Sequence, residues 1–254
     1  MTAGSAAAPV AVITGGAQGI GGAAAALLAA RGWTVHALDL RDSPEAAVLS
    51  HRCDVTDGAA LAALAGEIGP IDALICSAGI NLRPRDNSPE RLELAAWQKT
   101  LDVNLTGTML TVRAFRPSIR PEGAIVTLGS VAALRAMPWA DAYTASKGAL
   151  VALTRSWAVD YSRDGIRVNC VCPGPVDTGM MAGMIEQHAG AQQLQLPQQR
   201  MARPAEVAEL IAFLVSPGSS YISGTVIPVD GAATAHSAGM PFPRRRVPGG
   251  QAAG

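Results

Sequence analysis

The sequence predicts a single α/β domain in which a mostly parallel, seven-stranded sheet carries helices on both faces. Short apolar runs of β type alternate with longer segments of helical periodicity along most of the chain. Strands that alternate with helices are joined by right-handed crossovers, which produce a parallel, doubly wound sheet. The predicted strands are almost continuously apolar, as expected for strands that are buried on both faces.

Each element is assigned from its own run of residues, in chain order. A short apolar run and a glycine-rich turn precede an alanine- and leucine-rich helix, and the later strands repeat the apolar pattern. The predicted strands are 10–14, 33–40, 48–55, 73–77, 124–128, 166–172 and 225–229. The predicted helices are 22–31, 57–66, 89–115, 142–161 and a last helix that begins near residue 204. This last helix has a proline in its first turn and apolar residues at helical spacing, namely Val207, Leu210, Ile211 and Leu214.

The chain is long enough to bury one full core, because it has 254 residues of which 49% are hydrophobic. We expect a single domain over residues 1–240. Segment 179–200 mixes Met, Gly and Gln between a proline-rich turn and the last helix, which is typical of a mobile flap. The Pro- and Gly-rich segment 241–254 is expected to be a flexible C-terminal tail.

The composition argues against several classes of function. The formal net charge is zero and charged residues make up 16% of the chain, so we expect neither a nucleic-acid nor a membrane partner. No basic and apolar leader opens the chain, and no apolar run approaches the roughly 18 residues of a membrane span, so we expect a soluble, cytoplasmic protein. The cysteines lie in apolar strand-like segments and are expected to be reduced. The histidines show no metal-binding spacing, so no metal site is expected.

The glycine-rich turn after the first strand is typical of a phosphate-binding loop. Residues 14–21 read Thr-Gly-Gly-Ala-Gln-Gly-Ile-Gly. Glycines let the backbone turn tightly and approach a ligand, and the N-terminus of the next helix offers free N–H groups to a pyrophosphate. The strict G-x-G-x-x-G/A pattern is met only from Gly19, and that match alone is weak in a segment so rich in Gly and Ala. A tight turn without a ligand is therefore the alternative.

Two acidic residues at predicted strand ends favour a dinucleotide. Asp39 ends the second strand about 20 residues after Gly19, where a carboxylate can accept both adenosine ribose hydroxyls and would repel a 2′-phosphate. This position favours NAD, while Arg41 close by keeps NADP as the less favoured alternative. Asp54 ends the third strand and is expected either to accept from the adenine amino group or to cap a helix.

Tyr143 and Lys147 are four residues apart on a predicted helix and therefore share one of its faces. An ammonium beside a phenol favours the phenolate and lowers the phenol pKa from about 10. This makes Tyr143 a usable acid and base. Ser130 ends the fifth strand, and the carboxyl ends of parallel strands meet at the ligand crevice, so its hydroxyl is expected to reach a substrate oxygen there.

Together these motifs resemble the short-chain dehydrogenase/reductase family, in its form of about 250 residues with the Y-x-x-x-K motif. The resemblance covers essentially the whole chain and implies a Rossmann-type fold. It implies that residues 1–240 bind a dinucleotide and catalyse hydride transfer between nicotinamide and a secondary alcohol or ketone. The motifs that carry it are T-G-x-x-x-G-x-G at 14–21, Asn104, Ser130, Y-x-x-x-K at 143–147, Pro173-Gly174 and Val229-Asp230-Gly231.

The resemblance also implies a role for each catalytic residue. Tyr143 would donate or accept the proton, and Ser130 would orient the substrate oxygen. Lys147 would hold the nicotinamide ribose, and Asn104 would support a water in a proton relay. The implied cofactor-binding residues are Gly15, Gln18, Gly19, Ile20, Gly21, Asp39, Leu40, Asp54, Val55, Ser77, Ala78, Gly79, Tyr143, Lys147, Pro173, Gly174, Val176 and Thr178.

The chain departs from the family pattern after the fourth strand. The family has N-N-A-G where this chain has Cys76-Ser77-Ala78-Gly79, so the asparagine side chains that brace neighbouring strands are lost. The small Ala-Gly pair that lets the cofactor approach is kept. The resemblance therefore implies that catalysis is kept while this segment is braced less firmly.

The substrate pocket is expected to come from the loop 132–139, the start of the loop after Gly79 and the flap. Trp139 and several methionines suggest an apolar, adaptable pocket, although ordinary packing residues are an alternative reading. We therefore expect a hydrophobic or aromatic secondary alcohol or ketone. The candidate pocket residues are Ala132, Trp139, Met180 and Met184.

Two other functions remain open at this point. One is an NADPH-dependent reductase of 3-oxoacyl thioesters of acyl carrier protein or CoA, within the same family. The other is a dinucleotide-binding regulator without catalytic activity. The resemblance further implies a homo-oligomer, either a tetramer or a dimer. The other expected partner is the small-molecule substrate.

Overall fold

In the residues that the computed structural model describes, 7–180 and 196–237, seven strands form one parallel sheet. The strands are β1 (Val10–Thr14), β2 (Thr34–Asp39), β3 (Val48–Arg52), β4 (Ile71–Cys76), β5 (Ile119–Leu128), β6 (Arg167–Pro173) and β7 (Val226–Val229). Their order across the sheet is β3-β2-β1-β4-β5-β6-β7. The order reverses between β1 and β4, which is where open α/β sheets bind ligands.

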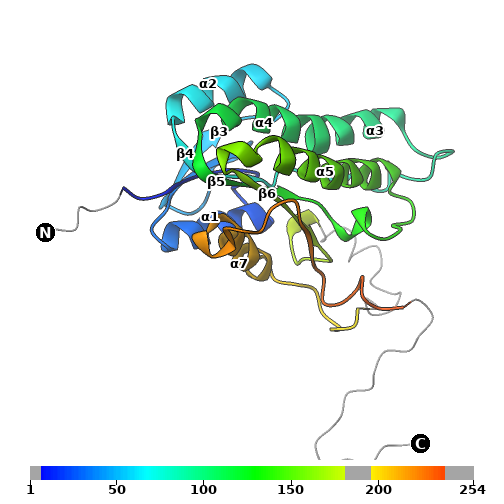
Figure 1. The fold of residues 1–254 in the computed structure, drawn as a ribbon. Helices are drawn as coiled ribbons and strands as arrows, with labels where there is room; N and C mark the ends of the chain where they lie inside the picture. The colour runs from blue at the N-terminus through cyan, green and yellow to red at the C-terminus, as the bar shows by residue number, and fades with distance from the viewer. Residues whose placement is uncertain (1–6, 181–195, 238–254) are drawn as a thin grey trace, which may run out of the picture.

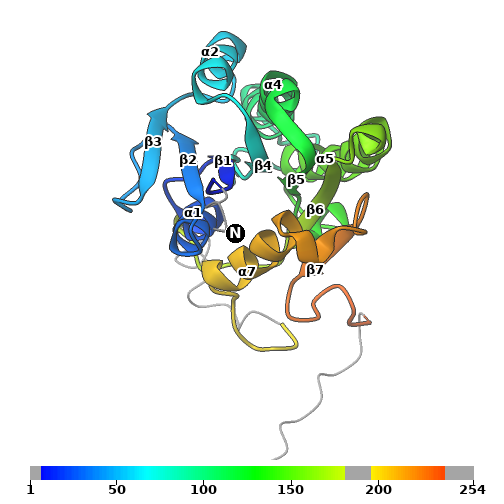
Figure 2. The ribbon, with the colours of Figure 1, turned by 60° about the vertical axis from the view of Figure 1, so that its left-hand side comes forward.

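Helices cover both faces of this sheet, as Figures 1 and 2 show. One face carries α1 and α7, and the other carries α2, α4 and α5, with α3 continuing into α4 (Figure 1). The helices are α1 (Gly19–Ala30), α2 (Gly58–Ile68), α3 (Leu94–Leu101), α4 (Gly107–Phe115), α5 (Asp141–Asp160) and α7 (Pro204–Val215). The predicted fold class is confirmed.

The two faces of the sheet give two hydrophobic cores, which follow from the alternation of side chains along a strand. In β5, the fully buried Val126 packs in the core that contains Ile211 of α7. Its neighbour Ile125 is also fully buried, but in the core that contains Phe115 of α4. Because both faces are covered, the central strands lack the polar alternation of a half-exposed sheet.

The predicted helix 89–115 is divided into two helices by a π-helical turn. α3 ends at Leu101, the π turn spans Asp102–Thr106, and α4 begins at Gly107. The sequence contains no proline here that would mark an interruption. Turns of this kind are frequent at functional sites, and this one contains the fully buried Asn104.

The third and fifth predicted strands differ most in length from the observed ones, while the other strand boundaries agree within two residues. β5 begins at Ile119 rather than at 124, because Ile119 pairs with Ile71 before an irregularity in the ladder. The residues between Ile119 and Gly123 are exposed, so they carry no apolar signal. β3 ends at Arg52 rather than at 55, because the Asp54 carboxylate bends the chain by accepting from the backbone N–H of Thr56.

The remaining expectations concern the cysteines, membrane-spanning helices, metal ligands, the flap and the tail. The cysteines are free and buried, as expected. Within 7–180 and 196–237, no helix has the length and apolar character that a membrane crossing requires, and no cluster of metal-ligating side chains occurs. Most of the expected flap 179–200, and all of the expected tail 241–254, lie outside the described residues.

Candidate active site

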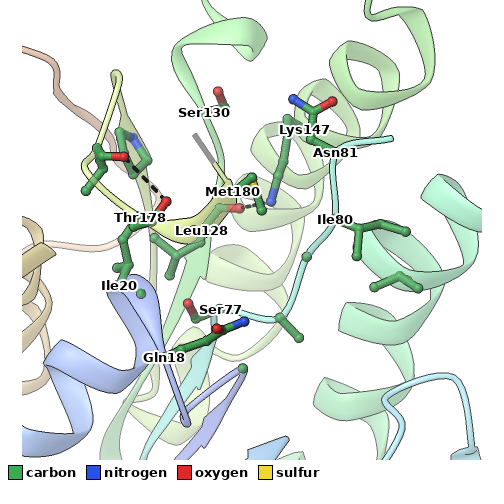
Figure 3. A pocket seen from close by; sticks show the side chains of 18 of the residues that line it. Gln18, Ile20, Ser77, Ile80, Asn81, Leu128, Ser130, Lys147, Thr178 and Met180 are labelled. Carbon is green, nitrogen blue, oxygen red and sulfur yellow. Dashed lines mark hydrogen bonds between the residues drawn. The ribbon is translucent and has the colours of Figure 1, made fainter. Parts of the chain in front are cut away.

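A cavity of about 430 Å³ lies at the carboxyl ends of the central strands. In Figure 3, Ser130 and Lys147 lie toward one end of it, and Gln18 and Ser77 lie toward the other. The predicted cofactor-binding residues all line this cavity, with the exception of Gly21. Ser130, Tyr143 and Lys147 line it as well, so the fold brings three of the predicted catalytic residues together.

The turn between β1 and α1 is built around glycines that no other residue can replace without strain. Gly15 has a φ of 66°, and a Cβ there would lie 2.9 Å from the backbone of Ala78. A Cβ on Gly21 would lie 2.2 Å from the Gly15 carbonyl oxygen, so Gly21 closes the turn from behind and does not reach the cavity. Gln18 precedes α1 and makes no side-chain capping bond, which leaves first-turn N–H groups available to an anion.

Two carboxylates mark the far end of the cavity. The Asp39 carboxylate accepts from the backbone N–H of Ala17 and of Arg41, each at 3.2 Å. These two bonds hold it at the mouth between β1 and β2. Asp54 accepts from the backbone N–H and the hydroxyl of Thr56 at 2.9 and 2.8 Å. These bonds hold the pKa of Asp54 below its usual range, so it is ionised at neutral pH.

Lys147 lies one helical turn after Tyr143 on α5 and is 5% exposed. Its Nζ donates to the carbonyl of Leu128 at 2.7 Å (Figure 3) and lies 5.7 Å from the centroid of the Tyr143 ring. Burial lowers the pKa of Lys147 to about 8. Gly79 makes room for this ammonium, because a Cβ at that position would lie 3.4 Å from Nζ.

The phenol of Tyr143 differs from expectation in its acidity. Burial raises the pKa of Tyr143, and the neighbouring Ser130 hydroxyl offsets only part of that increase. We expected the Lys147 ammonium to lower the pKa of the phenol. In the structure the ammonium lies over the ring and is bound to the Leu128 carbonyl, so desolvation of the phenol dominates.

Asn104 lies behind the cavity and not on its surface. Its Nδ2 donates to the carbonyl of Ile80 at 2.9 Å and to the hydroxyl of Ser146 at 3.1 Å. Its Oδ1 accepts from the backbone N–H of Ile80 at 2.7 Å. The side chain therefore joins the chain after β4 to α5. The water relay expected for this residue stays a prediction.

The segment Cys76-Ser77-Ala78-Gly79, which departs from N-N-A-G, is hydrogen-bonded to the neighbouring strand β1. The Thr14 carbonyl accepts from the backbone N–H of Ser77 at 3.2 Å. The Thr14 hydroxyl accepts from the backbone N–H of Ala78 at 3.3 Å. Thr14 is almost fully buried, and these bonds hold β1 against the end of β4.

The predicted substrate residues are spread over different environments. Met180 lines the cavity and is 47% exposed. Trp139 is 63% exposed and is not among the residues that line the cavity. Ala132 is buried behind the wall and donates its backbone N–H to the Ser130 hydroxyl at 3.1 Å. Met184 lies outside the described residues.

Several cavity residues were not identified by sequence reasoning. Ile80 and Val103 line the cavity from the chain after β4 and from the π turn, and Val131 follows Ser130. Ile80 directly follows Gly79, so its position in the chain was a usable signal. Val103 is adjacent to Asn104, but its place depends on the π turn, which the sequence does not reveal.

Comparisons with known proteins agree with this geometry. The family model described as enoyl-(acyl carrier protein) reductase matches residues 15–234. The cis-4-hydroxycyclohexanecarboxylate dehydrogenase of Sinomonas cyclohexanicum is 41% identical over 243 residues, which cover 89% of this chain and 96% of that protein. The 2-(R)-hydroxypropyl-CoM dehydrogenase of Xanthobacter autotrophicus is 37% identical over 246 residues, covering 89% and 98%.

A solved structure gives the same result for the fold. The ligand-free aldohexose dehydrogenase of Thermoplasma acidophilum superimposes with a TM-score of 0.86 at 31% sequence identity. The match covers 93% of this chain and 98% of that one. The chain has the glycine turn and the Ser130, Tyr143 and Lys147 set, and its relatives are named as dehydrogenases of hydroxy compounds. It therefore belongs to the short-chain dehydrogenase/reductase family and is an oxidoreductase acting on secondary alcohols or ketones.

Proposed function

We propose that this enzyme uses NAD and that its substrate is a hydrophobic secondary alcohol carrying a ring, or the corresponding ketone. The observation that carries the choice of cofactor is Asp39, whose carboxylate lies at the far end of the cavity and is held by two backbone N–H groups. A fixed negative charge accepts from ribose hydroxyls and repels a 2′-phosphate. Arg41 also lines the cavity, and it is the residue that would favour NADP.

The residues present fit a dinucleotide. Gly15 and Gly21 fold the turn so closely that a single Cβ would collide with backbone, which is the cradle that a pyrophosphate needs. Asp39 and Asp54 would hold the adenosine, and Thr178, which also lines the cavity, lies beside Gly19 of the glycine turn. The nicotinamide cofactor, when bound, accepts hydride from the carbinol carbon or returns it to the carbonyl carbon.

The side chains of the cavity supply the proton transfer. Tyr143 takes the proton from the alcohol oxygen during oxidation and gives it back during reduction. Ser130 donates a hydrogen bond to the same oxygen and stabilises its developing charge. Because burial raises the pKa of Tyr143, the phenol is protonated at neutral pH, so oxidation is expected to accelerate as the pH rises.

Lys147 is charged at neutral pH, because its pKa is about 8. An ammonium has three N–H donors, and the bond to Leu128 uses one of them. The others are available to ribose hydroxyls.

The substrate class is supported by the apolar wall of the cavity. Ile80, Met137 and Met180 line the same cavity as Ser130. Methionine is flexible and fills irregular gaps around a bulky apolar group. The relative named for a hydroxycyclohexanecarboxylate supports a ring alcohol as a member of this class.

The test is a comparison of kcat/KM for NAD and NADP with a panel of cyclic, aromatic, short linear and thioester substrates. We expect NAD to be preferred at least about 10-fold, which corresponds to one hydrogen bond to a charged group. We also expect cyclic or aromatic alcohols to give the highest values. A preference for NADPH together with turnover of 3-oxoacyl thioesters would overturn the proposal and would favour the alternative of an NADPH-dependent 3-oxoacyl thioester reductase.

We further propose that the enzyme is a cytoplasmic homotetramer, with residues 1–240 as its single catalytic domain. The support is the family assignment. Light scattering coupled to size-exclusion chromatography tests the assembly, and a monomer at micromolar concentration would contradict it.

A further inference from the structure

The loop after β4 holds the start of the catalytic helix with a buried carboxylate. Asp86 is fully buried. Its Oδ1 accepts from the backbone N–H of Ala142, and its Oδ2 accepts from the backbone N–H of Tyr143, both at 2.9 Å. Both oxygens of one side chain are thus bound to successive residues of the first turn of α5. The second of these residues is the catalytic tyrosine itself.

This carboxylate supplies what the helix cannot supply locally. The first N–H groups of a helix have no partner inside it, and a side chain just before the helix usually provides one. α5 is preceded by Ala140, whose methyl group cannot accept a hydrogen bond. Asp86, which is 57 residues from Tyr143 along the chain, takes that role. The positive end of the helix dipole also favours a negative charge at this position.

A second side chain of the same loop holds the residues just before the helix. Nε of Arg83 donates to the Trp139 carbonyl at 3.1 Å, and another guanidinium nitrogen donates to the Pro138 carbonyl. Burial lowers the pKa of Arg83, and the nearby Asp86 carboxylate offsets part of that shift. The buried negative charge therefore has a positive charge close by, which limits the cost of its desolvation.

The loop itself is anchored. The backbone N–H groups of Arg85 and Asp86 donate to the Leu82 carbonyl at 2.9 and 3.1 Å. The Arg85 guanidinium forms an ion pair with Glu93 at 2.8 Å, next to the start of α3. Asp86 thus acts from a braced loop and not from a free one. The same loop begins with the cavity residues Ile80 and Asn81.

We propose that Asp86 is a positioning residue, which fixes the rotation and height of the first turn of α5 so that the Tyr143 phenol faces the substrate oxygen. Two bonds from a single carboxylate restrain a turn more strongly than one bond does, since they define a direction as well as a distance. The inference rests on the proposed role of Tyr143. It goes beyond that role by assigning a function to a residue that lies outside the Ser130, Tyr143 and Lys147 set.

The test uses Asp86→Asn in the full-length enzyme. An amide has a single acceptor oxygen, so one of the two bonds is lost and the charge is removed while the shape is kept. A small displacement of a catalytic group costs as much as roughly 100-fold in rate. We expect kcat to fall roughly 10- to 100-fold per folded site, with the Kd for NADH unchanged within about twofold. We also expect a larger primary deuterium isotope effect on kcat with the carbinol-deuterated alcohol, because the chemical step becomes slower than product release.

Asp141→Asn is the matched control. Asp141 is the first residue of the same helix and is partly exposed, so its replacement removes a carboxylate from the same helix end without touching the bonds of Asp86. We expect its kcat and isotope effect to stay within about twofold of the wild type, as is usual for surface changes.

The other possible results each contradict either the positioning role of Asp86 or the proposed function. If Asp86→Asn keeps its kcat, or loses it with an unchanged isotope effect, the positioning role is wrong. If Asp86→Asn does not fold, Asp86→Ser is measured in the same way, and failure of both to fold shows that the carboxylate serves the fold rather than Tyr143. Tyr143→Phe separates the two proposals, because turnover by that variant would refute the proposed function and leave the hydrogen bonds of Asp86 unaffected.

Discussion

The two ends of the cavity are built in different ways. The cofactor half comprises the β1–α1 turn with Asp39 and Asp54, and it lies at the ends of the adjacent strands β1, β2 and β3. The substrate half comprises the loops 80–86 and 130–140, which come from strand ends but run far from them. In the cofactor half the backbone makes the shape, through Gly15 and Gly21. In the substrate half side chains such as Arg83 and Asp86 hold separate loops together.

This difference decides which features tolerate change. A Cβ on Gly15 or Gly21 would collide with main-chain atoms, so the turn would have to open to admit it. A loop held by side-chain bonds can shift by a fraction of an ångström and still fold. Substitutions in the cofactor half are therefore expected to affect stability and binding, whereas substitutions in the substrate half are expected to affect rate and selectivity.

The largest effect is expected at Tyr143, where the two halves meet. Tyr143→Phe removes the acid and base and leaves the ring in place, so kcat should fall by roughly 10²- to 10⁴-fold. The Kd for NADH, measured by fluorescence, should change little, because the ring that packs in the cavity is kept. A variant that retained a tenth of the wild-type kcat would mean that another group transfers the proton.

The next largest effect is expected from Gly21→Ala in the cofactor half. The added Cβ would lie 2.2 Å from the Gly15 carbonyl oxygen, so the turn has to open. Overpacking of this kind costs about 1–3 kcal/mol, and the free energy of unfolding from urea titration should fall by about the upper value.

Gly66→Ala provides the control for that measurement. Gly66 is an exposed residue of α2, and a Cβ there would meet no atom within 4 Å. Alanine is favoured over glycine inside helices by about 0.5–1 kcal/mol, so this variant should be slightly more stable than the wild type. Equal stability of the Gly21 and Gly66 variants would show that the β1–α1 turn is not rigid.

A smaller effect, confined to cofactor choice, is expected from Asp39→Ser. Removing the carboxylate removes both the acceptor for ribose hydroxyls and the repulsion of a 2′-phosphate. A hydrogen bond to a charged group contributes about 1.5–3 kcal/mol, so the ratio of kcat/KM for NAD to that for NADP should fall roughly 10- to 100-fold. Asp42→Ser, a change at an exposed carboxylate nearby, should leave that ratio unchanged. An unchanged ratio in the Asp39 variant would assign the selection to other residues.

The same contrast explains how much of the molecule could be predicted from the sequence. The parallel sheet, the glycine turn and Asp39 depend on local patterns and on one topological rule, so each could be predicted from the sequence, whereas the order of the strands was not predicted. Asp86 could not, because its partners are 56 and 57 residues away and an aspartate in a polar loop carries no local signal. The π turn at 102–106 escaped prediction for a similar reason, since its residues have ordinary helical character.

The smallest and most selective effects are expected in the substrate half, from a comparison of Met137→Ala with Trp139→Ala. Both residues lie in the loop before α5, but Met137 lines the cavity whereas Trp139 is 63% exposed and does not. Burying apolar surface against a ligand is worth about 25 cal/mol per Å², so the loss of part of a methionine side chain should cost about 1 kcal/mol. That cost corresponds to a KM raised roughly fivefold for a cyclic alcohol, with kcat for the same substrate nearly unchanged.

Trp139→Ala should change KM by less than about twofold, in keeping with an exposed side chain. A larger increase in KM for Trp139→Ala than for Met137→Ala would also be informative. Trp139 is held to the loop after β4, because its backbone carbonyl accepts a hydrogen bond from Arg83. A dominant effect at Trp139 would then indicate that the loop moves when substrate binds and brings the indole over the cavity. In that case Arg83→Gln, which removes the tie, should reduce the effect of Trp139→Ala in a double-mutant cycle.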